Sequence, residues 1–498
     1  MILQLPALII IVPLLAALGV IIAGWLRNAL CFPAALAALL VTLLSAILVM
    51  GQVMHDGALI YRLGGWEPPW GISFYIDHLN GVILILVSLV ALINLIATRS
   101  VVAQVFKNRL GAFYSLYLLF ATGLLGIVIT GDAFNLYVLL EIASLSGYAL
   151  LGMGGGRARL ASLHYVFMGT IGASLYLLGI GYLYIVTGSL NMLDLAALLP
   201  TVEKVSLIHV SFILCLVGLF IKMALFPLHA WLPNAYAQAP NPSASLIAPL
   251  TTKVMLYVMI RMVLTVYRPD LAFNRLPIGS LIVWLAVAAI IAGSLLAYKQ
   301  TRLRRMLACI IVVEVGYMVG GFWLGNAAGM TGALLHLLND AMMTLCIFLA
   351  AGAIATRVHA DTIAGLQGLF RKMPFTMAAF VVGALAIIGV PPTCGFFSKW
   401  YLLNGGIEAG HFGFTAALII SSLVNILIFF KVMEVAYFEP FENHHHHSNG
   451  QFIQEAPLDM VVPLLATAGF LIAMGIYAHS LVTGFIEPVI SPLMMGSL

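Results

Sequence analysis

The chain has 498 residues, of which 63% are hydrophobic and 8% are charged, and its formal net charge is +4. This composition excludes a soluble globular protein, which needs far more polar surface, and it gives no reason to expect a nucleic-acid partner. We therefore predict an integral membrane protein embedded in the lipid bilayer.

Apolar runs long enough to cross the bilayer follow one another from Ile2 almost to the C-terminus. A transmembrane helix needs about 20 apolar residues, and on this criterion we count about 14 spans and predict an all-α fold. The first run, near Leu5 to Trp25, has no basic leader and no small-residue cleavage site, which predicts a retained helix and not a signal peptide. The predicted spans are centred near Pro13, Leu40, Leu86, Phe120, Leu140, Ile171, Leu216, Leu256, Ala289, Val313, Cys346, Leu385, Ile420 and Leu471.

The basic residues of the loops predict the orientation, because Lys and Arg gather on the cytoplasmic side of a membrane. With an even number of spans both termini lie on one side, and the loops of that side contain only Arg62, Lys204, Arg268 and Arg275. Both termini are therefore predicted to be outside. The opposite, basic side contains Arg27, Arg99, Lys107, Arg109, Arg157, Arg159, Lys299, Arg302, Arg304, Arg305, Arg357, Arg371 and Lys372.

Two long loops carry residues with a special character. The loop from Gly51 to Asp77 contains Trp66 and Trp70, which suit an aromatic cap at the membrane interface. The acidic loop from Glu434 to Asp459 contains four consecutive histidines, His444 to His447. Such a run can bind a metal ion, but its polar flanks favour a solvated tract, so we predict no metal site.

The cysteines argue against a redox or structural metal centre. They are scattered through apolar segments without a C-x-x-C pair, which speaks against an iron-sulfur cluster, a zinc site and a disulfide framework. The chain also has no Rossmann or Walker loop. We therefore expect no cofactor and no catalytic residues. The cysteines are Cys31, Cys215, Cys309, Cys346 and Cys394.

Several ionisable residues are predicted to lie inside the spans, where a charge costs about 2.5 to 3.5 kcal/mol even on the mildest scale. Glu141 follows Asp132 by nine residues, which places it near mid-membrane at a rise of about 1.5 Å per residue. Lys222 precedes Pro227, which should break its helix at membrane depth. Lys253 lies in the middle of an apolar span.

Lys399 follows a second helix break, at Pro391 and Pro392. We interpret the buried glutamate and the three buried lysines as a proton relay, because a buried amine can load or release a proton when a carboxylate approaches or withdraws. The alternative for each is a snorkelling side chain or a buried ion pair that only fixes helix register. For Lys431 and Arg261, which lie nearer the span ends, snorkelling is the favoured interpretation.

The second half of the chain adds Glu314, and also His336 and Asp340 at i, i+4 spacing. This spacing stacks His336 and Asp340 on one helical face. A histidine beside an aspartate could hand protons along, since its usual pKa is near 6.5. A hydrogen-bonded core histidine is the alternative.

The two proline-broken spans are five spans apart, which is typical of a transporter built from inverted repeats. We predict repeats over spans four to eight and nine to thirteen, a division that aligns Glu141 with Glu314. The predicted segments are residues 1–110 (accessory helices), 111–268 (first repeat), 269–438 (second repeat) and 439–498 (acidic, histidine-containing loop and last helix).

Three stretches of sequence resemble a known family. They are FIKMALFPLHAWLPNAYAQAPNPSASLIAPLTTK, RLRRMLACIIVVEVGY and GVPPTCGFFSKWYLL. In order and spacing they resemble the antiporter-like membrane subunits shared by respiratory complex I, the Mrp sodium/proton antiporters and membrane-bound hydrogenases, and most closely the D-type Mrp subunit. The resemblance spans roughly Ala112 to Phe438 and implies the same inverted repeats.

The resemblance also implies a proton path in the plane of the membrane. The matching residues are Glu141 (the fifth-helix glutamate), Lys222 (the broken-helix lysine), Lys253 (the connecting lysine), His336 (the first central histidine) and Lys399 (the terminal lysine).

The central part of this path departs from the family pattern. Arg304 takes the position of a lysine, and because it cannot release its proton it would be only a fixed charge. Glu314 replaces a glutamine, and Asp340 and Thr344 replace a second histidine and a lysine. Arg304, Glu314 and Asp340 are therefore candidates for an altered central axis, whose carboxylates could titrate or bind sodium.

The implied function is that of an ion-translocating subunit of a multisubunit Mrp-type cation/proton antiporter, in the cytoplasmic membrane of a bacterium or archaeon. Its partners would be other hydrophobic subunits, protons and sodium. The alternative is a proton-pumping subunit of a complex I-like oxidoreductase, such as a membrane-bound hydrogenase, formate hydrogenlyase or NADH:quinone complex. A scaffold that has lost transport is disfavoured by the retained buried charges. The sequence leaves open the complex, the carried ion and the partner surfaces.

Overall fold

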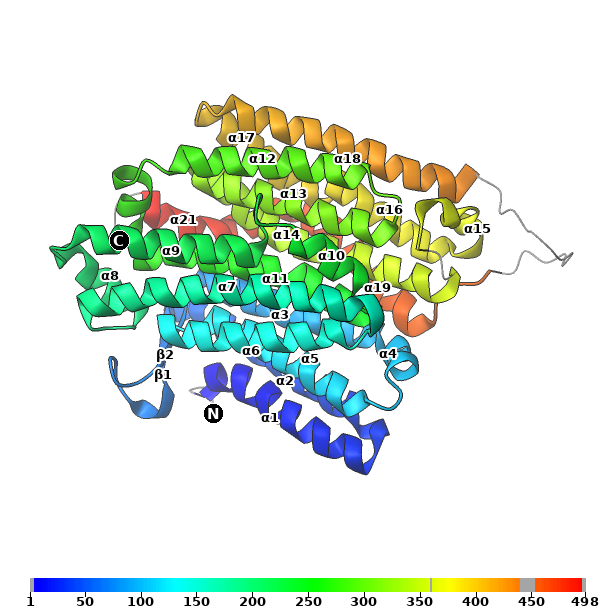
Figure 1. Ribbon diagram of the computed structural model, residues 1–498, viewed down its shortest axis with the longest axis horizontal. Coiled ribbons are helices and arrows are strands. Elements are labelled where there is room, and N and C mark those ends of the chain that lie inside the picture. The colour runs from blue at the N-terminus through cyan, green and yellow to red at the C-terminus, as the bar shows by residue number, and fades with distance from the viewer. Residues whose placement is uncertain (1–3, 359–360, 439–452, 495–498) are drawn as a thin grey trace, which may run out of the picture.

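The computed structural model describes residues 4–358, 361–438 and 453–494, and most of them lie in helices that run side by side (Figure 1). Within these residues, 13 helices are long and apolar enough to cross a membrane. The predicted span centred near Leu385 is a shorter apolar helix, α16 (Pro374–Ile388). Every predicted span centre falls in an apolar helix, which confirms the helical membrane fold.

The helices follow one another in four groups. The first contains α1 (Leu5–Leu26), α2 (Cys31–Asp56), α3 (His78–Ala97) and the short α4 (Arg99–Val105). The second contains α5 (Leu110–Ile129), α6 (Ala133–Gly152), α7 (Gly156–Thr187), α8 (Met192–Leu198), α9 (Val205–Met223), α10 (Trp231–Gln238) and α11 (Asn241–Arg261). The third contains α12 (Gly279–Tyr298), α13 (Leu303–Trp323), α14 (Ala327–Val358), α15 (Leu369–Lys372), α16, α17 (Cys394–Glu408) and α18 (Phe412–Phe438). The last contains α19 (Leu458–Ile476), α20 (Ala478–Leu481) and α21 (Glu487–Met494).

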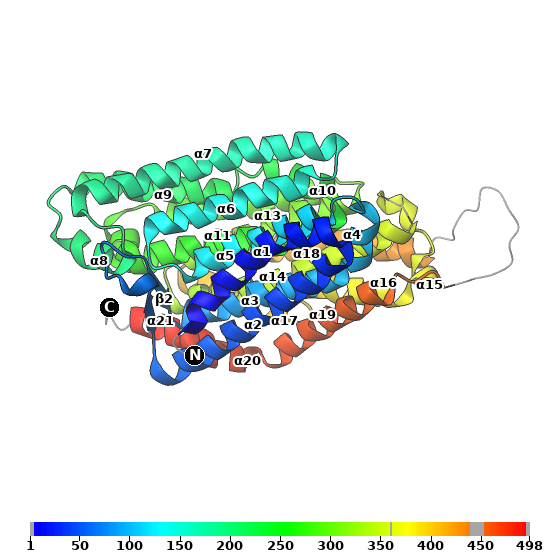
Figure 2. The same ribbon diagram turned by 90° about the horizontal axis from the view of Figure 1, so that it is seen from below.

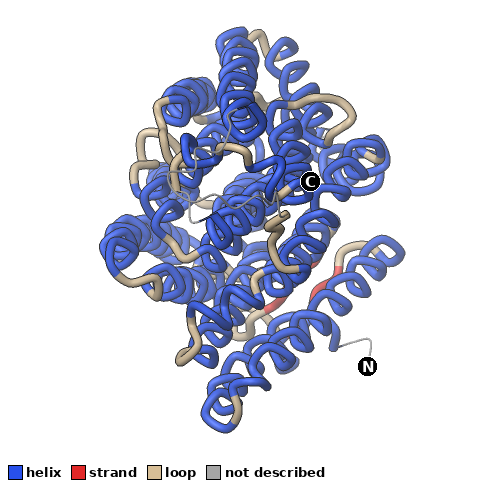
Figure 3. Tube along the Cα trace, turned by 90° about the vertical axis from the view of Figure 1, so that its right-hand side faces the viewer, coloured by secondary structure: helices blue, strands red, loops and turns tan. Residues whose placement is uncertain are grey.

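The loop from Gly51 to Asp77 contains a two-stranded antiparallel hairpin that sequence analysis did not predict. Its strands are β1 (Leu59–Arg62) and β2 (Ser73–Ile76), and it lies beside the N-terminal helices in the end-on view (Figure 3). Between the strands Trp66 and Trp70 are 69% and 89% exposed. Their role as an aromatic cap at the membrane interface stays a prediction.

Burial separates central helices from peripheral ones. The membrane-length windows of α11 and α13 are 100% buried and that of α14 is 78% buried, whereas α1, α7 and α18 are each 39% buried. Figures 1 and 2 show α1, α7 and α18 along the edges of the bundle. The apolar side chains of these outer helices, such as Leu15, Phe167 and Leu423, are exposed. They can face lipid or other membrane proteins, while α11, α13 and α14, together with α5 (83% buried), form the core.

Glycines let α7 and α9 approach each other closely, as is common between membrane helices. A Cβ atom at Gly172 would lie 2.9 Å from the carbonyl oxygen of Gly218, and one at Gly218 would lie 2.5 Å from that of Gly172. The same Cβ at Gly172 would lie 3.2 Å from Cγ of Lys222. The glycine contact therefore fixes the position of the helix segment that carries Lys222.

The loops divide between the two ends of the bundle. α4 and α15, which adjoin basic loops, lie toward the right in Figure 1, while α8 and the hairpin lie toward the left. α1 begins and α21 ends in the left half of the same view. The side of the membrane that each end faces stays a prediction, and His444 to His447 lie outside the described residues.

Candidate functional site

Two membrane helices are broken where the sequence predicts it. α9 ends at Met223, Ala224 adopts a left-handed conformation (φ 59°), and Pro227 lies in the connection to α10. α16 ends before Gly389, which is also left-handed (φ 90°), and Pro391 and Pro392 lie in the connection to α17. Proline removes a backbone donor and disfavours continuation of a helix, so these breaks follow directly from the sequence.

Each break leaves backbone carbonyls without their usual helical partners, and a side chain from beyond the break reaches back to them. In the first half, Trp231 Nε1 donates to the carbonyl of Ile221 at 3.0 Å. In the second half, Lys399 Nζ donates to the carbonyls of Ile387 at 2.7 Å and Ile388 at 3.3 Å. The neutral indole of Trp231 thus caps the first broken helix, and the amine of Lys399 caps the second.

The first cluster joins α6 and α9. Lys222 Nζ donates to Ser144 Oγ at 2.8 Å, and Ser144 lies three residues after Glu141 on the same helix. Lys222 is buried and interacts electrostatically with Glu141. In the described structure, Glu141 Oε1 is buried without a hydrogen-bond partner. Next to the first helix break, Lys222 therefore has a hydroxyl hydrogen-bond partner, Ser144, and an electrostatic partner, Glu141.

The second cluster is a buried ion pair between the helices of the core. Lys253 Nζ on α11 lies 2.8 Å from Asp340 Oδ2 on α14, and the two side chains are only 2% and 1% exposed. Thr344 Oγ1 donates to Asp340 Oδ1 at 2.9 Å and accepts a bond from Lys253 Nζ at 3.3 Å. Asp340, a departure from the family pattern, is thus the counter-ion of the connecting lysine.

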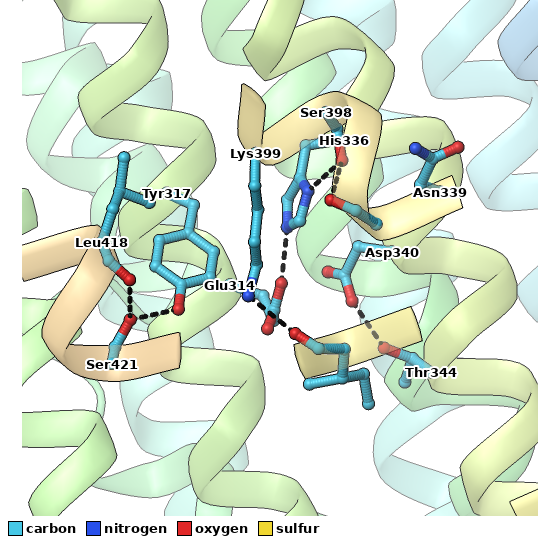
Figure 4. A network of polar contacts seen from close by, with 12 residues as sticks. Glu314, Tyr317, His336, Asn339, Asp340, Thr344, Ser398, Lys399, Leu418 and Ser421 are labelled. Atoms are coloured by element: carbon cyan, nitrogen blue, oxygen red, sulfur yellow. Dashed lines mark hydrogen bonds and ion pairs between the residues drawn. The ribbon is translucent and has the colours of Figure 1, made fainter. Parts of the chain in front are cut away.

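The third cluster joins α13, α14 and α17 around His336 (Figure 4). His336 Nε2 lies 2.5 Å from Glu314 Oε2, and His336 Nδ1 lies 2.8 Å from Ser398 Oγ. His336 and Asp340 share a face of α14, but each binds partners on other helices. The described hydrogen bonds of the histidine lead to Glu314 and Ser398 and not to Asp340, and proton exchange between His336 and Asp340 stays a prediction.

Lys399 lies beside this third cluster. Its Nζ atom donates to Ser422 Oγ at 3.2 Å, in addition to the two carbonyls of α16, and lies 4.9 Å from the centre of the Tyr317 ring. Lys399 also interacts electrostatically with Glu314 and Asp340. Figure 4 shows its side chain extending alongside His336 toward the Glu314 carboxyl group. The two halves thus each hold a lysine, a serine and a glutamate near a helix break.

Arg304 does not belong to these clusters. Its guanidinium group donates to the carbonyls of Ala237 at 2.5 Å and Ala239 at 3.0 Å, and to the side chain of Asn241. It therefore ties the beginning of α13 to the end of α10 and the start of α11. Glu314 is ten residues further along α13, which corresponds to about 15 Å. Sequence analysis placed Arg304 on the possible central axis, but the structure does not bring it to the three clusters.

The predicted snorkelling of Arg261 is wrong, because this residue forms a buried ion pair with Asp77. Its two terminal nitrogens each lie 2.7 Å from an oxygen of Asp77, and its side chain is only 6% exposed. Asp77, just before α3, caps that helix by accepting bonds from the backbone of Leu79 and Asn80. Burial opposes ionisation of Asp77, but Arg261 and these bonds outweigh it and lower the pKa of Asp77. Lys431 is exposed, and its snorkelling stays a prediction.

Sequence analysis did not predict that hydroxyl groups bind the ionisable residues. Ser144, Thr344 and Ser398 each bind a site residue. Two of them had a usable signal: Ser144 is one turn from Glu141, and Ser398 precedes Lys399 in a stretch that already resembled the family. Small hydroxyl residues are common in packed membrane helices, so their presence alone does not identify a site.

Comparison with known proteins decides the family. The family described as "NADH:quinone oxidoreductase/Mrp antiporter, TM" matches residues 130–425, which is more than half of the chain. The chain belongs to this family. The matched range contains every ionisable residue of the three clusters, together with both helix breaks.

Curated relatives come from both branches of the family. The N-type subunit of the NADH-quinone oxidoreductase of Desulforudis audaxviator is 39% identical over 492 residues, which cover 97% of this chain and 98% of that protein. The D-type subunit of the Na(+)/H(+) antiporter of Alkalihalophilus pseudofirmus is 29% identical over 85% of each chain. A putative antiporter subunit of Staphylococcus epidermidis is 32% identical over 84% of this chain and 81% of that protein.

Solved structures show the same fold. A chain of an archaeal membrane-bound sulfane sulfur reductase superposes with a TM-score of 0.88 at 28% identity, covering 97% of both chains. A chain of the Mrp complex of Dietzia sp. superposes with a TM-score of 0.86 at 24% identity, covering 100% of this chain and 99% of that one. These similar chains come from multisubunit membrane complexes, which makes other membrane subunits the expected neighbours of this chain.

Proposed function

We propose that this chain is the proton-translocating membrane subunit of a multisubunit Mrp-type cation/proton antiporter, with sodium as the candidate counter-ion. The observation that carries the proposal is the series of buried ionisable clusters across the bundle. Charged groups are costly in a membrane protein interior and are retained mainly where they serve ion movement. Here they occur beside both broken helices and between them.

The proposed path follows the clusters in the plane of the membrane. A proton would move from Glu141 and Lys222 to Lys253, then past His336 to Lys399. A buried ammonium group is stable only with acceptors or a counter-ion, so the protonation state of each lysine follows the position of its partners. Serine and threonine hydroxyls beside these lysines can both accept and donate protons in hydrogen bonds.

We further propose that two repeats give this path its symmetry. We propose that residues 111–268 and 269–438 form inverted repeats, with 1–110 and 439–498 as additional segments. Lys222 precedes its helix break while Lys399 follows the second one, so the two lysines are not at equivalent points of their broken helices. What the two halves share is a glutamate on the second helix of each predicted repeat: Glu141 on α6 and Glu314 on α13.

We also propose that the basic loops face the cytoplasm and that both termini are outside, in the cytoplasmic membrane of a bacterium or archaeon. Lys and Arg are enriched in cytoplasmic loops, and 13 of the 17 basic residues that sequence analysis assigns to loops belong to the basic side. Labelling of single introduced cysteines in intact cells tests this orientation. A cysteine at position 66 should react with an impermeant reagent, whereas one at position 157 should not.

A complex I-like oxidoreductase is the second candidate, because the chain is 39% identical to the N-type subunit of an NADH-quinone oxidoreductase along almost its full length. Both complexes could use the same buried clusters, so the complex must be identified by its other subunits. Purification of the intact assembly separates the two. Small hydrophobic subunits alone favour the antiporter, whereas subunits with iron-sulfur clusters or nickel favour the oxidoreductase.

The path itself is tested by proton flux into vesicles that contain the assembled complex. Glu141→Gln and Lys222→Ala should abolish flux while the complex still assembles. Lys431→Ala, which removes an exposed lysine on the outer helix α18, is the matched control and should keep the flux. Normal flux in either of the first two variants would refute the proposed path. Repeating the assay with sodium or potassium as the only counter-ion identifies the exchanged ion.

A further inference from the structure

The hydrogen bonds around His336 define where its protons are. Ser398 Oγ donates to the backbone carbonyl of Gly395 at 3.2 Å. A serine hydroxyl has one hydrogen, so while Ser398 donates it to Gly395 it can only accept toward His336 Nδ1, at 2.8 Å. In this arrangement of hydrogen bonds the Nδ1 atom carries a hydrogen. His336 is completely buried.

The protonation of the other ring nitrogen, Nε2, is then restricted by its contact with Glu314. Its contact with Glu314, 2.5 Å between Nε2 and Oε2, requires a proton between two atoms that both otherwise present lone pairs. Either the ring is an imidazolium beside a carboxylate, or it is a neutral Nδ1–H imidazole beside a carboxylic acid. Both forms contain one proton at this contact and have no net charge, which suits a site where both side chains are at most 1% exposed.

Lys399 does not bind Glu314 in the described conformation. Its three donors point to Ile387, Ile388 and Ser422, which together satisfy one ammonium group. Glu314 Oε1, the second carboxyl oxygen, is buried without a hydrogen-bond partner among the described residues. Glu314 and Lys399 still interact electrostatically. The free oxygen is the natural acceptor site for the lysine amine once it leaves the carbonyls of α16.

We propose that Glu314, His336 and Ser398 form a shared-proton site, which holds one proton in the Glu314–His336 contact and exchanges it with Lys399 through the Glu314 carboxyl group. This inference rests on the proposed function and adds a titrating unit where the family pattern has a glutamine. Ser398 is a positioning residue, because it keeps the hydrogen on Nδ1 and so leaves Nε2 to face Glu314.

The proton transfer balances within the site. When the Lys399 amine is neutral, the carboxylic acid form of Glu314 gives it one proton, which leaves a carboxylate and an ammonium group. His336 Nε2 and Glu314 Oε2 then present lone pairs to each other, and this repulsion favours reloading. In this proposal the replacement proton comes from the Lys253 ammonium group, whose counter-ion Asp340 lies one turn from His336 along α14. Besides these residues, Tyr317 is the ionisable side chain whose ring contacts His336.

The first half provides a matched comparison. Glu141 also has a buried oxygen without a partner and a lysine nearby, but its described contacts include no histidine. Substitution of Glu141 should therefore stop transport without changing the protonation of His336. Substitution of Glu314 should do both.

Nitrogen NMR of the full chain with ¹⁵N-labelled histidine, in lipid nanodiscs, tests the site without measuring flux. In the wild type, the His336 signals, assigned from their loss in His336→Gln, should show a protonated Nδ1 and an Nε2 that shares a proton. Glu314→Gln should give a neutral ring with hydrogen on Nδ1 only. Ser398→Ala should move the hydrogen to Nε2, and Ser398→Thr should restore the wild-type pattern. A wild-type ring with a bare Nδ1 would overturn the proposal.

Proton flux gives a second, independent test. Removal of a positioned proton donor costs about 100-fold or more in rate, so Glu314→Gln and His336→Gln should each lower flux by that factor. The double variant should be no slower than either single variant, because both belong to one unit. Losses that multiply would refute a shared site. If Glu141→Gln keeps full flux while the NMR result holds, the proposed transport path fails and the shared-proton site remains.

Discussion

Removing one member of the Lys253–Asp340 pair should destabilise the protein more than removing both. The two side chains are 2% and 1% exposed and lie 2.8 Å apart. In Asp340→Asn the Lys253 ammonium group keeps its bond to Thr344 but loses its counter-ion. Breaking a buried pair in this way typically costs about 3 to 5 kcal/mol, whereas replacing both members with apolar residues of similar size is often close to neutral.

The measurement is the free energy of unfolding in mixed micelles of a mild detergent and sodium dodecyl sulfate. Asp340→Asn and Lys253→Met should each lose about 3 to 5 kcal/mol. The double variant Lys253→Met/Asp340→Leu should be more stable than either single variant and should have no proton flux. Additive losses in the double variant would show that the two groups do not stabilise each other, and the assignment of Asp340 as counter-ion would be wrong.

Three further predictions test the surrounding structure. Folding lowers the pKa of Asp77. Its contribution to the free energy of unfolding is therefore complete above the usual aspartate pKa and is lost as the pH falls through the lowered value. The free energy of unfolding of Asp77→Asn should accordingly fall less on acidification than that of the wild type. Gly172→Val should lower the free energy of unfolding by about 1 to 3 kcal/mol by forcing α7 from α9, whereas Gly181→Val, in open space on the same helix, should not. Arg304→Lys should lower the free energy of unfolding by about 1.5 kcal/mol or more, because a lysine cannot bind the acceptors on both helices. It should keep proton flux. Arg305→Lys is the exposed control.

The helices and their breaks could be predicted from the sequence because both depend on local properties. Hydrophobic length determines a membrane span, and Pro227, Pro391 and Pro392 interrupt helices wherever they occur. The hairpin after α2 was missed because its strands are only four residues each and lie in a loop that length criteria treat as irregular.

The partners of the ionisable residues could not be predicted in the same way. The i, i+4 spacing correctly placed His336 and Asp340 on one face of α14, but helix spacing gives no information about which other helices face that side. Glu314 on α13 and Lys253 on α11 reach it because the helices pack together in the core. For Arg261, position near a span end predicted snorkelling, and only the packed structure shows Asp77 next to it.

The different caps of the two broken helices have a consequence for how each half can move. Lys222 can change its hydrogen bonds while Trp231 continues to hold the carbonyl of Ile221. Lys399 cannot, because its departure strips the carbonyls of Ile387 and Ile388 of the donor it provides. Each time Lys399 changes partner, the end of α16 must find another donor or shift. On the proposed path, the second half would link a charge movement to a backbone movement, whereas the first half would need no backbone movement.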